Sequence, residues 1–320
     1  MREVYADDLR TERGQRMGRP LRVGVQLPEV ERVVTWPEIR DMATTAEDAG
    51  FDSLWVGDHL LYRSEGETSG PWEAWSMLAA IAAVTDRVQI GPLVAATSFH
   101  GPAMLAKKAV TVDEISDGRL ILGLGAGWNK VEYEAYGYPF DHRASRFEEA
   151  FTIIRTLLSE GSVDFAGEYY TLRDCELVPP ARHGGIPIMI GSEGPRVLGA
   201  TLPHVDSWNA WHAWYDNSVE GAEALLGRID DHCTAAGRDP STLGRSLAVF
   251  VRTPGGDTGI RQGSPDRKSS FAIEGSQDDV ARHLAGLAGV GVDEVQLVVD
   301  PITAASIEWL GVVLDMLDAG

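Results

Sequence analysis

The sequence predicts an α/β protein, a (β/α)8 TIM barrel with insertions after strands 4 and 7. Eight strand-like runs rich in Val, Ile and Leu alternate with helical patterns along the 320 residues. Several runs are continuously apolar, which is typical of parallel strands covered by helices on both faces. The segments AGFDSLWVGD and VGVDEVQLVVD repeat one order of glycine, turn, aspartate and strand, which indicates a repeated βα unit. Functional residues of such a barrel lie at the carboxyl ends of its strands.

The expected strands are short runs of branched aliphatic residues bounded by Gly, Pro, Asp or Ser. They cover residues 21–27, 53–57, 88–95, 120–126, 187–191, 206–210, 247–252 and 294–300. Helix start signals lie between them: Thr35 with Glu38 and Ser276 with Asp279 have the spacing of capping boxes, and Pro102 opens a third helix.

Two segments are longer than ordinary barrel loops. Residues 163–180 follow the fourth unit and have the pattern of an inserted strand pair. Residues 253–270 follow the seventh strand, are rich in Gly, Pro, Ser and charge, and are expected to form a mobile lid. Residues 1–20 are expected to be a disordered polar leader, so that 21–320 form a single barrel domain.

An open doubly wound sheet is the competing fold. The stretch GLGAGW at 123–128 follows a strand and precedes a helix, as a dinucleotide fingerprint does. However, Trp128 stands in place of the third glycine, and the stretch belongs to the fourth unit instead of the first. The sequence therefore favours the barrel.

The composition narrows the expected partners. With 28 Lys and Arg against 48 Asp and Glu, the net charge is −20, which repels nucleic acid and anionic membranes. No long apolar run is present, so the protein is expected to be cytoplasmic. Cys175 and Cys233 are expected to be reduced thiols. The eight His residues lack H-x-H and H-x-x-x-H spacing, so no metal site is expected.

The most informative residues follow the second strand. Asp58 and His59 stand side by side in SLWVGDHLL. A buried charge is costly without a partner, so the pair indicates either a catalytic site or a strand-end cap beside a half-exposed histidine. An ordinary imidazole pKa of about 6.5 suits proton exchange near neutral pH.

Other strand ends add candidates. Gly125 ends the fourth strand and lets a planar ligand approach the backbone, with Trp128 and Asn129 close behind. The fifth strand ends in IGSEGPRV, which either holds a phosphate on backbone amides or is an ordinary turn. The sixth ends in WNAWHAWY, whose aromatic residues either wall a pocket or pack under the helices.

Together these stretches resemble the luciferase-like superfamily of flavin and deazaflavin oxidoreductases. The resemblance covers residue 21 to about residue 317. It rests on Trp-Val-Gly-Asp-His after strand two, on GPAMLAKKAVTVDEISDGRLILGLGAGWNKVEYEAYGYPFDHRASRFEE, and on IPIMIGSEGPRVL followed by DSWNAW. Their order and spacing are most similar to the branch that uses the 5-deazaflavin coenzyme F420.

The resemblance implies a cofactor across the carboxyl-terminal mouth of the barrel. Asp58 and His59 would be catalytic residues beside the ring, and a non-proline cis peptide within 92–94 would lie behind it. His59 would exchange a proton with the substrate, while Asp58 would orient His59 or bind the ring. The implied cofactor-binding residues are Asp58, Leu93, Val94, Gly125, Trp128, Asn129, Gly191, Ser192, Glu193 and Gly194.

The implied reaction is hydride transfer between coenzyme F420 and a small-molecule substrate. Deazaflavins do not form the oxygen adduct of flavins, so oxygen insertion is not expected. Sugar-phosphate dehydrogenases of the superfamily have a carboxylate where Trp128 stands, and they bind the substrate phosphate with lysines. In this chain only one lysine, Lys268, lies in the later half. An apolar or aromatic substrate is expected instead, with Trp128, Tyr62, Phe99 and Trp211 as its surroundings.

Two other functions stay open. One is an FMN-dependent monooxygenase fed by a separate flavin reductase, since it shares this barrel and often the phosphate loop. The other is a non-catalytic cofactor-binding barrel. In each case a homodimer is expected, because twofold dimers are the commonest symmetric assembly.

Overall fold

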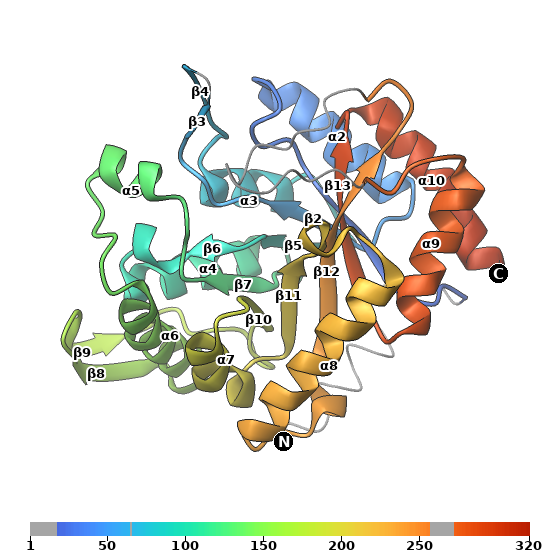
Figure 1. Ribbon diagram of the computed structural model, residues 1–320. Coiled ribbons are helices and arrows are strands. Elements are labelled where there is room, and N and C mark those ends of the chain that lie inside the picture. The colour runs from blue at the N-terminus through green and yellow to red at the C-terminus, as the bar shows by residue number, and fades with distance from the viewer. Residues whose placement is uncertain (1–17, 65, 257–271) are drawn as a thin grey trace.

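The computed structural model describes residues 18–64, 66–256 and 272–320, which form a nearly closed parallel barrel with helices outside it (Figure 1). Nine strands lie side by side in the order β5, β2, β1, β13, β12, β11, β10, β7, β6. The barrel prediction is confirmed and the open sheet is wrong. The strands are β1 (Arg22–Gln26), β2 (Ser53–Val56), β5 (Gln89–Pro92), β6 (Ala95–Ala96), β7 (Leu122–Gly125), β10 (Ile188–Gly191), β11 (Ser207–Trp211), β12 (Gly244–Arg252) and β13 (Glu294–Asp300).

The sheet has nine strands because the third strand of the barrel is interrupted and counts as two, β5 and β6. β5 pairs with β2 and β6 pairs with β7, while Leu93 and Val94 bulge between them. The barrel closes before the bulge, where Ile90 bridges to Leu120. The peptide bond between Leu93 and Val94 is cis, within the segment where the resemblance implies one. The bulge follows β5 and therefore lies at the carboxyl-terminal mouth.

Nine α-helices of the described ranges surround the strands (Figure 1). Ser276 and Asp279 form the predicted capping box of α9. The capping box predicted from Thr35 and Glu38 is wrong: Thr35 is the N-cap of α2 but makes no capping hydrogen bond, and Glu38 pairs with Arg32 instead. The helices are α2 (Trp36–Asp48), α3 (Ala74–Ala82), α4 (Pro102–Ile115), α5 (Lys130–Tyr136), α6 (Arg143–Glu160), α7 (Pro195–Thr201), α8 (Val219–Ala235), α9 (Gln277–Gly289) and α10 (Ala304–Ala319).

Two antiparallel hairpins extend from the barrel (Figure 1). The strand pair predicted after strand 4 is confirmed as β8 (Ser162–Ala166) and β9 (Thr171–Glu176). The other hairpin, β3 (Tyr62–Ser64) and β4 (Glu67–Ser69), was not predicted, because three-residue strands are too short to show a period. Most of the predicted lid at 253–270 and most of the predicted leader at 1–20 lie outside the described residues.

Buried polar and apolar groups occupy separate places inside the barrel. Near the starts of β1, β2 and β13, Glu294 accepts a hydrogen bond from Ser53 (2.7 Å) and pairs with Arg22 (2.7 Å). These partners satisfy a charge that would otherwise be costly inside the barrel. Toward the mouth, an apolar cluster forms the floor: Ala213, Ala248, Phe250 and Val298, with Leu93 and Trp211 against them.

Neither cysteine is paired: Cys175 is half-buried and Cys233 is buried. Among the described residues, no helix is long and apolar enough to cross a bilayer. The same ranges contain no cluster of three or more His, Cys, Asp or Glu side chains placed to hold a metal ion.

Replacing Asp113 with asparagine is expected to stabilise the fold at neutral pH. Asp113 on α4 is 2% exposed, and burial raises its carboxyl pKa to about 6. Below about pH 4 the Asp113 carboxyl is protonated in both the folded and the unfolded chain. Above about pH 6 it is ionised in both, and burying the charge lowers the free energy of unfolding by up to about 3 kcal/mol. Urea unfolding should show a gain for Asp113→Asn at pH 7.5 that disappears at pH 4; an equal gain at both pH values would contradict this origin.

Candidate active site

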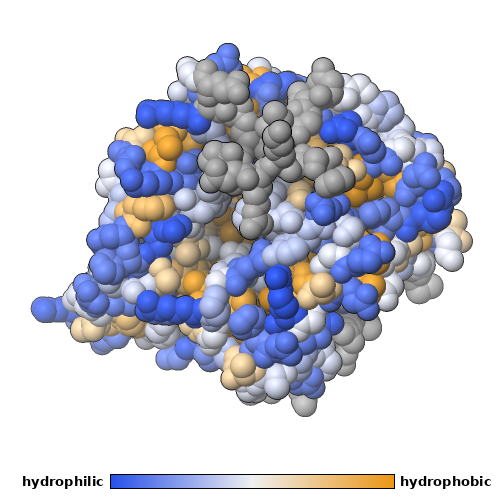
Figure 2. Space-filling view, viewed as in Figure 1, coloured by the Kyte–Doolittle hydropathy of each residue, from blue (hydrophilic) through white to orange (hydrophobic). Residues whose placement is uncertain are grey.

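The predicted catalytic pair follows β2 at the mouth of the barrel, where β7 and β10 also end. Because all these strands are parallel, their carboxyl ends open on one side. Figure 2 shows that most of the surface in this view is hydrophilic, broken by small apolar patches, as the net charge of −20 suggests.

Asp58 stabilises the interrupted third strand of the barrel, which consists of β5 and β6. It is 3% exposed, and its Oδ2 accepts hydrogen bonds from the backbone N–H of Ala96 (2.9 Å) and from Nε2 of His100 (2.9 Å). The first bond joins the end of β2 to β6 across the Leu93–Val94 bulge. Oδ1 accepts no hydrogen bond from the described residues. Asp58 thus caps the start of β6 through Oδ2, and its Oδ1 can accept a hydrogen bond from a ligand.

His100 has one defined tautomer. Its Nδ1 lies 3.3 Å from Nζ of Lys108 on α4. An ammonium group can only donate, so Nδ1 accepts and Nε2 carries the proton that His100 donates to Asp58. This chain of Lys108, His100 and Asp58 keeps Asp58 an acceptor.

His59 turns to a different set of partners. Its Nδ1 lies 3.0 Å from Oε2 of Glu132, a fully buried residue of α5 whose Oε1 also accepts the backbone N–H of Leu60. Its Nε2 lies 3.9 Å from Oε1 of Glu29, which follows β1. Glu132 orients His59; the role of orienting His59 implied for Asp58 is not seen, because Asp58 bonds Ala96 and His100 instead.

The electrostatics favour a charged ring at His59. Burial disfavours the imidazolium, but the nearby carboxylates of Glu29, Glu132 and Asp58 outweigh burial and raise the pKa of His59 above its ordinary value. The side chain is 18% exposed, so the ring can still meet a ligand. His59 therefore holds a proton more tightly than a free imidazole does.

Two aromatic rings lie close to the ring of His59. The ring of Tyr62 lies 4.8 Å from it and that of Trp128 lies 5.7 Å away, and Trp128 is 47% exposed. Phe99 does not join them: it is buried and packs on Tyr133 at 5.0 Å. Of the four aromatic residues predicted around a substrate, Tyr62 and Trp128 flank His59, whereas Trp211 packs on the apolar floor.

Glycines make room for the bulge. A Cβ on Gly125 would lie 2.7 Å from Cγ2 of Val94, and a Cβ on Gly191 would lie 2.8 Å from the same methyl group. Side chains at these two positions would displace Val94. Gly125 and Gly191 end β7 and β10, so they allow the bulge to lean across the mouth.

The loop after β10 is held by hydrogen bonds. The indole N–H of the buried Trp208 donates to the backbone oxygen of Ser192 (2.7 Å), and the Ser192 hydroxyl accepts the N–H of Gly194 (3.2 Å). The carboxylate of Glu193 accepts the Tyr215 hydroxyl and lies 3.5 Å from Arg228. The loop is therefore ordered, and the one negative side chain in it is compensated. Trp208 packs inside instead of walling a pocket.

A match to a known family decides the identity of the fold. Residues 19–254 match the family described as luciferase-like monooxygenase. The chain belongs to this family.

Curated relatives of this luciferase-like chain include F420-dependent enzymes. It is 36% identical over 165 residues to the F420-dependent glucose-6-phosphate dehydrogenase of Amycolatopsis mediterranei, which covers 50% of this chain and 49% of that one. It is 35% identical over 161 residues to the 5,10-methylenetetrahydromethanopterin reductase of Archaeoglobus fulgidus, covering 50% and 45%. The matches thus span about half the length of these two relatives.

Solved structures share the fold of this luciferase-like chain at low sequence identity. An F420-dependent secondary alcohol dehydrogenase, solved with an F420-acetone adduct, superposes with a TM-score of 0.77 at 19% identity and covers 93% of this chain and 99% of that one. A riboflavin lyase solved with modified FMN has a TM-score of 0.76 at 14% identity, covering 93% and 91%. The solved structures therefore show that the fold of this chain is shared by proteins solved with F420 and with FMN.

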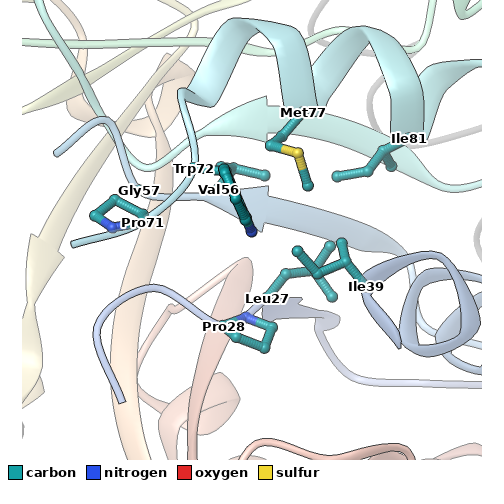
Figure 3. Close-up of a pocket in the computed structure, with 9 residues that line it drawn as sticks. All are labelled: Leu27, Pro28, Ile39, Val56, Gly57, Pro71, Trp72, Met77 and Ile81. Atoms are coloured by element: carbon teal, nitrogen blue, oxygen red, sulfur yellow. The ribbon is translucent and has the colours of Figure 1, made fainter. Parts of the chain in front are cut away.

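An apolar pocket outside the barrel is distinct from this site (Figure 3). It lies among β1, β2, α2 and α3 and is lined by nine residues, among them Ile39, Val56, Trp72 and Met77. Its free volume is about 10 Å³, which is room for about one water molecule. A cavity of this size does not hold an organic substrate.

Three site residues of this luciferase-like protein were missed by sequence reasoning: Glu29, Glu132 and His100. Glu29 lies just beyond the first strand, so its position at a carboxyl-terminal strand end was an available signal. Glu132 and His100 lie in or next to helices, and only the folded contacts distinguish them from the many other acids and histidines.

Replacing His100 with phenylalanine is expected to destabilise the fold by about 1.5 to 3 kcal/mol, because a hydrogen bond to the buried Asp58 carboxylate is lost. His100→Gln keeps an N–H donor and should recover part of the loss. Urea unfolding at pH 7.5 would measure both variants. A smaller loss for His100→Phe than for His100→Gln would mean that ring packing on Trp75, at 6.3 Å, matters more than the hydrogen bond.

Proposed function

We propose that this chain is an oxidoreductase that transfers a hydride between coenzyme F420 and a small apolar or aromatic organic substrate. The observation that carries the proposal is His59 at the barrel mouth, fixed through Nδ1 by the buried Glu132 and half-buried beside the rings of Tyr62 and Trp128. A proton-exchanging side chain beside an apolar wall suits the redox chemistry of an uncharged carbon compound.

The residues of the mouth fit a flat heterocycle. The glycines at 125 and 191 let Val94 lean over the strand ends, so an apolar surface lies where a ring would stack. Oδ1 of Asp58 is left to accept a hydrogen bond from such a ring. The ordered loop at 191–194 would hold the phosphate through backbone N–H groups.

The mechanism assigns a separate task to each side chain. Bound coenzyme F420 would supply the hydride donor or acceptor. Because Glu132 occupies Nδ1, Nε2 is the atom of His59 that exchanges a proton with the substrate. Tyr62 and Trp128 would exclude water from one side of the substrate, and Asp58 would hold the ring edge while it braces the bulge.

An absorption spectrum of the protein purified from a host that makes both cofactors tests the proposal. The expected result is a deazaflavin band, together with binding to F420 at least tenfold tighter than to FMN in titrations. Preferential tight binding of reduced FMN would overturn the choice of F420 in favour of a two-component monooxygenase. Clean F420 binding without hydride transfer to any of a broad panel of substrates would favour a non-catalytic barrel.

We further propose a homodimer in the cytoplasm. Support comes from the general prevalence of twofold dimers and from the composition of the chain. Light scattering at working concentration should give twice the chain mass of 34.7 kDa; the mass of one chain would contradict the dimer.

A further inference from the structure

Lys108 on α4 donates a hydrogen bond to a histidine instead of to an acid. Its Nζ lies 3.3 Å from Nδ1 of His100, and within the described ranges it forms no direct ion pair with a carboxylate. The chain has 48 Asp and Glu against 28 Lys and Arg, so acidic partners are plentiful. Lys130 on α5, for comparison, pairs with Glu134 at 2.9 Å. The contact between Lys108 and His100 therefore needs an explanation other than charge pairing.

The start of α4 brings Lys108 and His100 together. His100 follows the short 3-10 turn Thr97–Phe99 and lies just before the helix, whereas Lys108 lies in the second turn of α4. Side chains of a helix lean toward its N-terminus, so the lysine reaches back to the imidazole. The side chain of His100 is 9% exposed, and its ring packs on Trp75 at 6.3 Å. The ring therefore has little freedom to turn away from Lys108.

The ammonium group of Lys108 excludes a proton from Nδ1 of His100. An ammonium has three N–H donors and no acceptor, so a proton on Nδ1 would place two donors face to face. Nδ1 is therefore the acceptor of this contact. Nε2 carries the single ring proton, which His100 donates to Oδ2 of Asp58 at 2.9 Å.

Each alternative protonation of His100 would change Asp58. Protons on both nitrogens would make the ring a cation that cancels the negative charge of the carboxylate. A proton on Nδ1 alone would turn the lone pair of Nε2 toward Oδ2 and break the hydrogen bond. With the observed tautomer, Asp58 keeps its charge, and Oδ2 keeps its bonds from His100 and from the N–H of Ala96. Those two bonds fix the plane of the carboxylate and leave Oδ1 as an acceptor.

We propose that Lys108 is a positioning residue for the cofactor ring: it keeps His100 in the Nε2–H form, so that Oδ1 of Asp58 remains a charged and fixed acceptor at the mouth. A hydrogen bond to a carboxylate is stronger than one to a neutral acceptor, so the affinity for a ring with an N–H group depends on this form. The inference rests on the proposed function only in placing a flat heterocycle at the mouth, and it applies to F420 and to FMN.

Long-range proton–nitrogen NMR of the cofactor-free protein, labelled at histidine and assigned with His100→Gln, tests the tautomer. At pH 7 the wild type should show His100 in one form, protonated at Nε2 and unprotonated at Nδ1. In Lys108→Met, Nδ1 should become partly protonated, because the group that excludes the proton is gone. Lys108→Arg keeps a cationic donor and should keep the pattern of the wild type.

Lys107→Met is the matched control for the NMR experiment. Lys107 is the next residue of α4, but its Nζ donates to the backbone oxygen of Val178, so the signals of His100 should not change. A proton on Nδ1 in the wild type, or an unchanged pattern in Lys108→Met, would overturn the inference.

Titrations with F420 and with FMN test the consequence for the cofactor. Lys108→Met should weaken binding of the cofactor that the wild type prefers by about fivefold or more, because the bond to Oδ1 of Asp58 loses its charged or fixed acceptor. Lys108→Arg and Lys107→Met should bind as the wild type does. Affinity equal to that of the wild type in Lys108→Met would contradict the proposal.

The double variant Lys108→Met with Asp58→Asn tests whether the effect passes through Asp58. Asp58→Asn alone removes the charged acceptor, so Lys108→Met should cause no further loss in that background. An equal loss in both backgrounds would overturn the inference, since Lys108 would then act by another route. Tight binding of FMN without binding of F420 would overturn the proposed function, and the same Lys108 comparison made with FMN would then decide the inference.

Discussion

Replacing His59 with alanine is expected to lower turnover by about 100-fold or more, the usual contribution of a positioned proton donor or acceptor. Binding of F420 should stay nearly unchanged, because the hydrogen bonds that hold the bulge and the loop after β10 come from Asp58 and Trp208. Steady-state kinetics with a reactive substrate and a separate titration of the cofactor would measure the two effects.

Two controls make the His59→Ala result specific. His59→Gln can still donate to Glu132 but cannot exchange a proton, so it should be as slow as the alanine variant. Added imidazole should restore part of the activity of His59→Ala, because the deletion leaves space beside Tyr62 and Trp128. Turnover equal to that of the wild type would remove His59 from the proton-transfer role.

Replacing Gly125 with alanine is expected to weaken F420 binding by at least tenfold, which corresponds to about 1.4 kcal/mol. The new Cβ would lie 2.7 Å from Cγ2 of Val94 and 3.4 Å from the backbone oxygen of Gly191. Valine is stiff about χ1, so the strain passes to the Leu93–Val94 bulge and tilts the surface on which the ring would lie. Fluorescence titration with F420 would measure the loss.

The double variant Gly125→Ala with Val94→Ala should recover much of the lost affinity, since it removes the clashing methyl group. Gly199→Ala, in α7, is the control: no atom lies within 4 Å of its Cβ position, so affinity should not change. If Gly125→Ala binds F420 as tightly as the wild type, the glycines are not needed to place the bulge under the ring.

Local sequence patterns predicted most of the scaffold. All eight barrel strands lie at apolar runs that end in turn residues. The helix start at Ser276 follows from Ser276 and Asp279, which are only three residues apart. The Thr35–Glu38 box failed for a tertiary reason: the acid has a better partner in Arg32, which the chain brings to it. The hairpin at β3 and β4 is held by pairing and not by any repeated pattern.

The sequence also predicted Asp58 and His59 as site residues, but it did not predict the contacts that each side chain makes. Asp58 and His59 adjoin in the chain and still face different neighbours. Asp58 meets His100, 42 positions away, whereas His59 meets Glu132, 73 positions away. No periodicity links such distant residues, so neither contact was predictable without the fold.

The amino-acid order by itself determined the barrel, its family and the residues at the strand ends, because hydrophobic period, turn chemistry and quoted motifs are properties of short segments. Only the tertiary structure decided the tautomer of His100, the raised pKa of His59 beside Glu29 and Glu132, and the hydrogen bond by which Asp58 joins the end of β2 to β6. The physical reason is that pKa values and hydrogen bonds depend on distance in space and on burial, and both are set when loops from separate βα units meet at one rim.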